Sequence, residues 1–131
     1  MCIRDSGRYG NIEAIEKIVQ ICIAHKVQKV IVPKFGLLST PATSHLIRKE
    51  NAIGGIILSA SHNPGGIDGD FGVKLNISNG GPAPEMITNK IFKASQLLTS
   101  YKICKIQLPD FSEYGTYSYG ETILELSLIH I

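Results

Sequence analysis

The apolar run at residues 52–59 most strongly constrains how this chain can fold. Its sequence, AIGGIILS, is apolar almost throughout, and it leads into residues 60–71, which contain Pro64 and three glycines. A short run of this kind is typical of a central β-strand that is covered on both faces. Residues 60–71 cannot form a regular element, because proline and glycine interrupt helices and strands. The sequence therefore predicts a buried strand that ends in an irregular loop.

Helical and strand-like patterns alternate on both sides of this strand. Residues 11–26 repeat apolar side chains every three or four positions, which favours a helix, and residues 29–32 (KVIV) favour a buried strand. We expect a short helix over 40–50, a strand over 72–76 and a helix with one apolar face over 84–98. This alternation indicates a layered α/β domain.

The sequence after residue 102 is harder to interpret. Residues 104–108 are compatible with one more strand, and residues 111–126 concentrate aromatic side chains without a clear period. We therefore assign no firm structure to residues 111–126.

Composition excludes several classes of protein. The 131 residues suffice for one domain, and 44% hydrophobic with 18% charged residues is a globular balance. The net charge of +2 is too small to indicate nucleic-acid binding. No apolar run approaches the roughly 18 residues that a membrane span needs. We therefore expect no nucleic-acid partner and no membrane partner.

The cysteines and the first residues bear on location. Cys2, Cys22 and Cys104 form no CxxC pair and are odd in number, which argues against a disulfide framework or a zinc site. The first residues, MCIRDS, lack the apolar stretch of a secretory signal. We therefore expect a reducing, cytoplasmic location.

The polar residues directly after the buried strand are the first candidate for a functional site. Ser59, Ser61 and His62 stand beside glycines that allow a close approach to a ligand, at the end of a strand, where α/β sheets bind ligands. A serine nucleophile or a phosphoserine needs polar groups nearby, and the candidate cations are His62, Lys74 and Arg8. The alternative is a polar turn whose serines bond the local backbone.

Two further segments are weaker candidates. Asp68 and Asp70 resemble part of a calcium loop, but the ligands are too few and the spacing is absent, so we reject that interpretation. Backbone N–H groups at residues 79–85 precede a helix and could hold an anion, although a simple helix entry is favoured. Lys74 lies in an alternating strand and points either to solvent or to the end of the sheet that carries Ser61.

Residues 54–85 (GGIILSASHNPGGIDGDFGVKLNISNGGPAPE) resemble the active-site region of the α-D-phosphohexomutase superfamily. The SASHNP motif is highly specific, and GDFG-x-K-x-N with NGGPAPE favours the phosphoglucomutase branch over the phosphomannomutase branch. Residues 35–49 and the GRYGN motif at residues 7–11 also resemble family segments. The resemblance covers about residues 7–125. It implies the first of the family's four domains, an α/β/α layer around a small mixed sheet.

The resemblance implies roles for individual residues. Ser61 corresponds to the serine that carries the phosphoryl group, whose phosphate also binds the essential Mg²⁺. His62 and Lys74 correspond to catalytic residues, with Lys74 in acid–base chemistry or charge stabilisation. Arg8 corresponds to the arginine that contacts the phosphate of the sugar substrate. The implied reaction interconverts glucose 1-phosphate and glucose 6-phosphate through phosphoserine and glucose 1,6-bisphosphate.

Parts of the family pattern are missing from this chain. The metal-binding DGDGDR loop, the sugar-specificity loop and the C-terminal phosphate-binding domain do not occur, and Ser6 replaces an aspartate. Residues 1–6 and 126–131 match nothing in the family, and we expect them to be non-native or frayed. We expect a fragment that is inactive alone and needs the missing domains of its parent chain.

Two other interpretations remain open. One is a non-enzymatic mutase-like protein with a structural or adhesion-related role, against which the intact serine motif and Lys74 argue. The other is an unrelated phosphoserine-binding module, which requires the long resemblance to be a coincidence.

Overall fold

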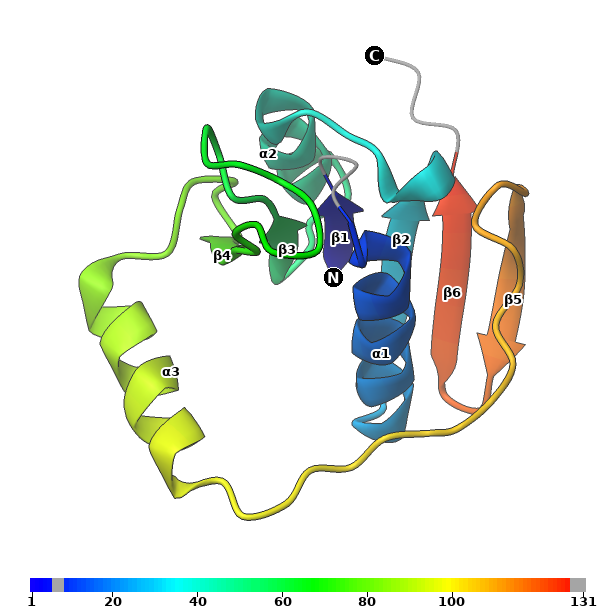
Figure 1. Ribbon diagram of the computed structural model, residues 1–131. Coiled ribbons are helices and arrows are strands. Elements are labelled where there is room, and N and C mark those ends of the chain that lie inside the picture. Colours follow the sequence, from blue (N-terminus) through cyan, green and yellow to red (C-terminus); the bar gives the residue numbers. More distant parts are fainter. Residues whose placement is uncertain (6–8, 128–131) are drawn as a thin grey trace.

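The computed structural model describes residues 1–5 and 9–127 (Figure 1). Within these residues the chain forms a mixed sheet of six strands, three α-helices and a short 3-10 helix, η1. In chain order the elements are β1 (Cys2–Asp5), α1 (Asn11–Ala24), β2 (Lys29–Pro33), η1 (Lys34–Gly36), α2 (Thr40–Lys49), β3 (Gly54–Leu58), β4 (Val73–Ile77), α3 (Glu85–Leu97), β5 (Gly115–Tyr119) and β6 (Thr122–Ser127). The predicted α/β class is confirmed.

The strands lie in the order β4-β3-β1-β2-β6-β5. The four inner strands β3, β1, β2 and β6 run parallel to one another, whereas the outer strands β4 and β5 are antiparallel to their neighbours. The carboxyl ends of the inner strands therefore meet at one edge of the sheet. The segments that follow β2 and β3 start from this edge, where α/β sheets bind ligands.

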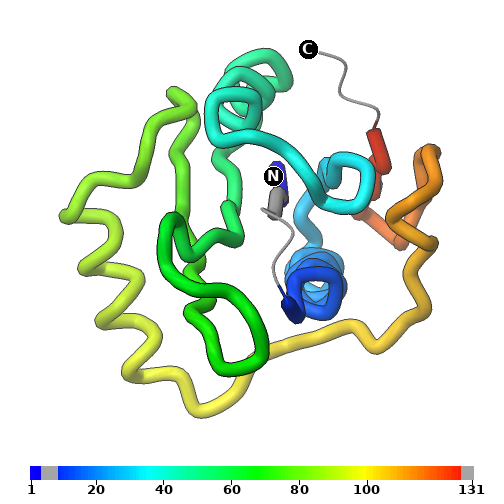
Figure 2. The backbone as a smooth tube through the Cα atoms, turned by 45° about the horizontal axis from the view of Figure 1, so that its top comes forward, coloured from blue at the N-terminus to red at the C-terminus, as the bar shows by residue number. Residues whose placement is uncertain are grey.

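Helices α1 and α2 cover opposite faces of the sheet (Figures 1 and 2). Ile15 and Val19 of α1 pack in one buried cluster with Ile3. Ile47 of α2 packs in a second cluster with Cys2. Because neighbouring residues of a strand point to opposite faces, Cys2 and Ile3 anchor the two layers from the same strand. The result is the α/β/α arrangement that the family resemblance implies.

The predicted strand at residues 52–59 is confirmed as β3, and it is buried along most of its length. Ile57 and Leu58 are almost inaccessible to solvent. The helices expected over 11–26 and 40–50 are confirmed as α1 and α2, and the strand expected over 72–76 is confirmed as β4. The central strand is therefore a fixed base for the loop that follows it.

The segment after residue 102 differs from expectation. Residues 104–108 form no strand, and instead lie against α1, where the Cys104 N–H donates to the Gln20 carbonyl at 3.2 Å. Gln20 Nε2 donates in turn to the Ile106 carbonyl at 3.0 Å. These bonds to a helix replace the bonds that a neighbouring strand would supply. Further on, β5 and β6 form a hairpin, and β6 joins the sheet beside β2.

Helix α3 is regular, as predicted, but none of its residues is buried. Its apolar side chains Met86, Ile91, Phe92 and Leu97 are between 49% and 82% exposed. Figure 1 shows α3 standing apart from α1 and from the sheet. Ile87, Ile91 and Ala94 share one side of the helix, and this apolar side belongs to neither buried cluster.

The N-terminal end is more ordered than expected. Cys2–Asp5, within the segment expected to be non-native or frayed, form β1 between β2 and β3 at the centre of the sheet. Residues 6–8, with Arg8, and residues 128–131 lie outside the described residues. Among the helices of the described ranges, none is both long and apolar enough to span a membrane.

Candidate functional site

The loop after β3 lies at the carboxyl edge of the parallel strands. Residues 59–72 connect β3 to β4 without regular structure, which confirms the irregular loop predicted over 60–71, and most of them are exposed. Figure 2 shows this loop in green. Because β4 returns antiparallel to β3, with Leu58 paired to Val73, the two ends of the loop lie side by side.

Ser61 and Lys74 are in direct contact. Lys74 Nζ donates a hydrogen bond to Ser61 Oγ at 2.7 Å. Lys74 lies near the start of β4, opposite Ile57, so its side chain reaches the end of the sheet that carries Ser61. Both residues remain exposed and accessible to a ligand. An ammonium group at this distance stabilises negative charge that develops on the serine oxygen.

The backbone of Ser61 adopts the left-handed conformation, with a φ of 55°. This conformation is uncommon for a residue that has a side chain. The Ser61 N–H donates to Ser59 Oγ at 3.1 Å, and the Asn63 N–H donates to the Ala60 carbonyl at 3.1 Å. The segment is therefore a hydrogen-bonded turn, as the alternative interpretation holds, and the same turn places the Ser61 hydroxyl beside Lys74.

The base of the loop is closed by Ser59 and Gly72. The Ser59 N–H donates to the Gly72 carbonyl at 2.8 Å. A Cβ atom at position 72 would lie 2.4 Å from the Ser59 carbonyl oxygen, so no side chain fits there without a shift of the backbone. The sequence alone does not reveal this requirement, because the close approach depends on how β4 pairs with β3. In the sequence, Ser59 stands out only as the first serine of the SASHNP motif.

His62 lies on the same loop, but it does not join the contact between Ser61 and Lys74. Its side chain is exposed, and none of the hydrogen bonds found among residues 1–5 and 9–127 includes its imidazole. Arg8 falls outside the described residues. The structure therefore brings together two of the four predicted site residues, Ser61 and Lys74, and the roles of all four stay predictions.

The described residues contain no cluster of metal ligands. No group of three or more His, Cys, Asp or Glu side chains in this part of the chain could hold a metal ion. Asp68 and Asp70 are exposed on the loop, in the segment where the calcium interpretation was rejected. The donor atoms in this part of the chain therefore do not by themselves make a Mg²⁺ site.

The turn before α3 is occupied by its own hydrogen bonds. The Gly81 N–H donates to Asn79 Oδ1 at 2.8 Å, and the buried Asn76 donates from Nδ2 to the Gly80 carbonyl at 2.8 Å. Arg48 Nη1 donates to the Asn79 carbonyl at 3.3 Å. These bonds favour the helix-entry interpretation of residues 79–85 over an anion site.

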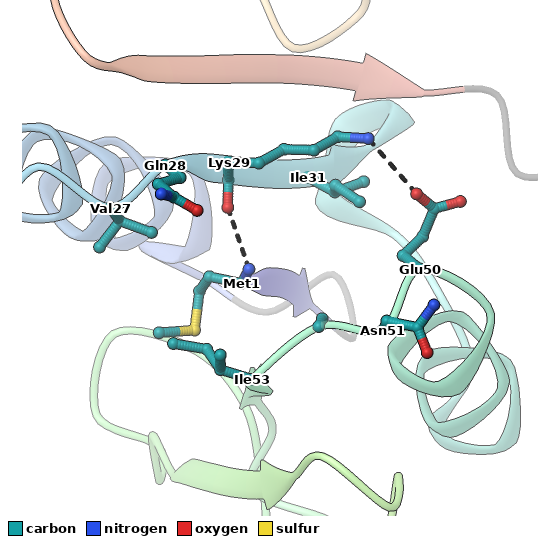
Figure 3. A pocket seen from close by; sticks show the side chains of 9 residues that line it. Met1, Val27, Gln28, Lys29, Ile31, Glu50, Asn51 and Ile53 are labelled. Atoms are coloured by element: carbon teal, nitrogen blue, oxygen red, sulfur yellow. Dashed lines mark hydrogen bonds and ion pairs between the residues drawn. The ribbon is translucent and has the colours of Figure 1, made fainter.

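The cavity in Figure 3 lies at the amino ends of β2 and β3, away from the loop. It measures about 350 Å³, and Val27 and Ile53 are among its lining residues. Lys29 forms ion pairs there with Glu50 at 3.3 Å and Glu125 at 2.7 Å. The hydrogen bond that Lys29 donates to Glu125 raises the pKa of Lys29. Since Ser61 and Lys74 do not line this cavity, it is not the candidate site.

Comparison with known protein families points to one family. The model of the phosphoglucomutase/phosphomannomutase alpha/beta/alpha domain I matches residues 3–102. The phosphoglucomutase of Emericella nidulans is 52% identical over 130 residues, which cover 99% of this chain and 23% of that protein. Phosphoglucomutase-1 of Oryctolagus cuniculus is 55% identical over 119 residues, which cover 91% of this chain and 21% of that protein.

The solved structures include one with the same fold. The crystal structure of parafusin, an exocytosis-sensitive phosphoprotein and phosphoglucomutase from Paramecium, in its open form, has a TM-score of 0.89 and 36% identity. The match covers 98% of this chain and 25% of that one. The chain thus spans about a quarter of the length of the relatives that it matches.

Proposed function

Since this chain belongs to the phosphoglucomutase/phosphomannomutase family and matches its alpha/beta/alpha domain I, we propose that Ser61 carries the phosphoryl group in the reaction of the full-length parent protein. The reaction interconverts glucose 1-phosphate and glucose 6-phosphate through phosphoserine and glucose 1,6-bisphosphate. The 2.7 Å contact between Lys74 Nζ and Ser61 Oγ supports this proposal most directly. The family resemblance of residues 54–85 is the basis for glucose as the sugar and for the bisphosphate intermediate.

Two phosphoryl transfers make up the proposed reaction. In the first, the bond between Ser61 Oγ and phosphorus breaks while a hydroxyl oxygen of the hexose monophosphate bonds to phosphorus, which forms the bisphosphate. The proton of the sugar hydroxyl passes to a base, and Ser61 Oγ gains a proton. In the second, Ser61 Oγ loses its proton and bonds to the other phosphorus while the bond from that phosphorus to the sugar oxygen breaks. The sugar oxygen takes up a proton, and the isomeric hexose monophosphate leaves.

Lys74 acts on the serine oxygen in both transfers. As the bond from phosphorus to Ser61 Oγ breaks, negative charge develops on that oxygen, and the Lys74 ammonium group stabilises it. The same group can donate the proton that Ser61 needs. His62, exposed on the loop, is a proposed catalytic residue, and Arg8 is the proposed ligand of the sugar phosphate. Both of these roles rest on the family resemblance.

The Mg²⁺ that the family resemblance implies would have one ligand from the described part of this chain. That ligand is a phosphate oxygen on Ser61, because no cluster of acidic side chains lies among the described residues. When bound, Mg²⁺ would offset the charge of the transferring group. The remaining ligands are expected from the rest of the parent, and we derive no step through the metal.

The rest of the parent chain is the proposed partner of this domain. The relatives are about four times as long as this chain, since it spans 23% of the first of them. Val73 on β4 is 64% exposed, and the apolar residues of α3 are exposed as well. Exposed apolar surfaces of this kind mark interaction sites. We propose that further residues of the parent cover them, and the cytoplasmic location stays a prediction of the sequence.

Replacement of Ser61 by alanine in the full-length parent tests the proposed function. The S61A variant lacks Oγ, so we expect it to lose interconversion of the two glucose phosphates by a factor of at least about 10⁴. Ser78 is an exposed serine at the end of β4, and the S78A variant should keep full activity. Unchanged turnover in the S61A variant would contradict the proposal.

The non-enzymatic alternative has a different outcome. If the full-length protein shows neither turnover nor phosphate on Ser61 when it is saturated with glucose 1,6-bisphosphate, a structural role is favoured. The 131-residue chain alone should show no turnover, because the proposed metal ligands and substrate contacts lie largely outside it.

A further inference from the structure

We propose that Ser59 is a positioning residue for phosphoryl transfer, because its hydroxyl holds the Ser61 backbone in the conformation that presents Oγ to Lys74. The Ser61 N–H donates to Ser59 Oγ at 3.1 Å. The Ser61 hydroxyl accepts from Lys74 Nζ at 2.7 Å. Ser61 is therefore held at both its amide and its side chain, and the proposal rests on the proposed role of Ser61 as phosphoryl carrier.

The hydrogen bond to Ser59 stabilises the left-handed backbone conformation of Ser61. A φ of 55° crowds the Cβ atom of an L-residue against its own backbone, so a free chain at this position favours other conformations. A change of φ at Ser61 rotates the bond from Cα to Cβ and carries Oγ away from Lys74. A hydrogen bond from the Ser61 amide to Ser59 opposes that rotation.

Ser59 is itself fixed by the sheet. It follows directly on Leu58, the last residue of β3, and its N–H donates to the Gly72 carbonyl at 2.8 Å. Gly72 in turn precedes β4, the strand that carries Lys74. Ser59 and Lys74 therefore hold Ser61 from two paired strands, so the distance between the two supports is set by the strand register and not by the loop.

The competing interpretation is that Ser59 only stabilises a local turn. Serine side chains often accept a hydrogen bond from the backbone two residues later. A turn of that kind affects how well the loop folds, but it does not act selectively on the chemical step. The two interpretations therefore differ in which kinetic constant the loss of Ser59 Oγ changes.

The test uses the full-length parent with S59A and S59T variants and S78A as the matched control. S59A should lower kcat about tenfold, the effect expected when about 1.4 kcal/mol of positioning is lost. KM for glucose 1-phosphate should change less than about twofold, since Ser59 is not placed against the sugar. S59T keeps a hydroxyl at the same position and should restore most of kcat, and S78A should match the parent.

The outcomes separate this inference from the proposed function. If S59A keeps the parent's kcat while S61A loses activity, Ser59 does not position the transfer and only this inference fails. If S59T is as impaired as S59A, or if kcat falls only as far as the folded fraction measured by circular dichroism, the positioning role is likewise overturned. Full activity of S61A would instead overturn the proposed function itself.

Discussion

The loop at residues 59–72 and helix α3 are both exposed, yet they are exposed for different reasons. The loop has no regular structure, but hydrogen bonds at Ser59, Ser61 and Gly72 connect it to two strands. Helix α3 is regular along its length, but no residue in it is buried. Regular secondary structure is therefore a poor guide to which region is held in place. Exposed polar groups in defined contacts indicate chemistry, whereas exposed apolar side chains indicate a missing partner.

Among the changes in the loop region, loss of the Lys74 ammonium group should lower kcat the most. In the full-length parent, K74A should reduce kcat by about 10²–10³, because a donor aimed at the reacting oxygen is lost. Steady-state kinetics of glucose 1-phosphate conversion measures this. Lys102 is an exposed lysine outside the site, and K102A should behave like the parent. Equal activity of K74A and K102A would show that the contact with Ser61 is incidental.

An aspartate on the apolar side of α3 tests the other region. I91D should destabilise the full-length parent by about 3 kcal/mol, because it would bury a charge at the proposed contact with the rest of the protein. In the 131-residue chain, where Ile91 is 49% exposed, the effect should stay below about 0.5 kcal/mol. Urea unfolding of both proteins measures the difference.

A control on the other side of α3 makes the previous test specific. Asn89 is exposed and lies two positions from Ile91, so it points away from the apolar side of the helix. N89D should leave the stability of both proteins unchanged. If I91D and N89D behave alike in the full-length parent, the apolar side of α3 is not covered there.

A side chain at position 72 should disturb the loop through its backbone. G72A would place a Cβ atom 2.4 Å from the Ser59 carbonyl oxygen, so β4 or Ser59 must shift. We expect a loss of about 2 kcal/mol in the free energy of unfolding, and a lower kcat as well. In G81A the new Cβ would meet only the Asn79 side chain, at 3.2 Å, and that side chain can move. An equal loss in the two variants would argue against the close approach at Gly72.

The smallest change in stability is expected when the ion pair of Lys29 and Glu125 is removed. The hydrogen bond that Lys29 donates to Glu125 raises the pKa of Lys29 above its ordinary value of 10.5. Because the pKa of Lys29 is higher in the folded state than in the unfolded state, its protonation stabilises the fold. This stabilisation is fully present below pH 10.5 and is lost as the pH rises through the folded-state pKa of Lys29. Because Lys29 is 42% exposed, E125Q should cost less than about 1 kcal/mol.

The pH dependence of that small effect is the check. Urea unfolding at several pH values should show a constant difference between the parent and E125Q from neutral pH to about pH 10, and a shrinking difference above pH 10.5. The activity should not change, since this ion pair lies apart from Ser61. A difference that grows above pH 10.5 would contradict the assignment of the raised pKa.

The centre of the domain was predictable because its signals are local. The buried strand β3, the irregular loop after it and helices α1 and α2 each follow from short patterns of apolar residues, glycine and proline. The contact between Ser61 and Lys74 was predicted only in part: Lys74 was a candidate cation for the serine, but its direction was open. The alternation around Lys74 left two directions open, and only the antiparallel register of β4 with β3 selects one of them.

The hairpin of β5 and β6 was not predicted, because its stability comes from a distant partner. Thr122, Leu124 and Leu126 are buried at every second position, as in a strand with one buried face. That pattern was obscured by the aromatic residues around it, and β6 gains its place by pairing with β2, which lies far away in the sequence. The exposure of the apolar side of α3 could not be predicted either, because an apolar pattern does not reveal which part of the protein covers it.

The location of phosphate on the full-length parent tests the central claim most directly. The protein would be incubated with glucose 1,6-bisphosphate and digested, and the peptide that contains residues 59–72 would be sequenced by mass spectrometry. We predict one phosphate, on Ser61, which disappears when glucose 1-phosphate or glucose 6-phosphate is added in excess. Phosphate on a different residue of a protein that still turns over, with none on Ser61, would contradict the account.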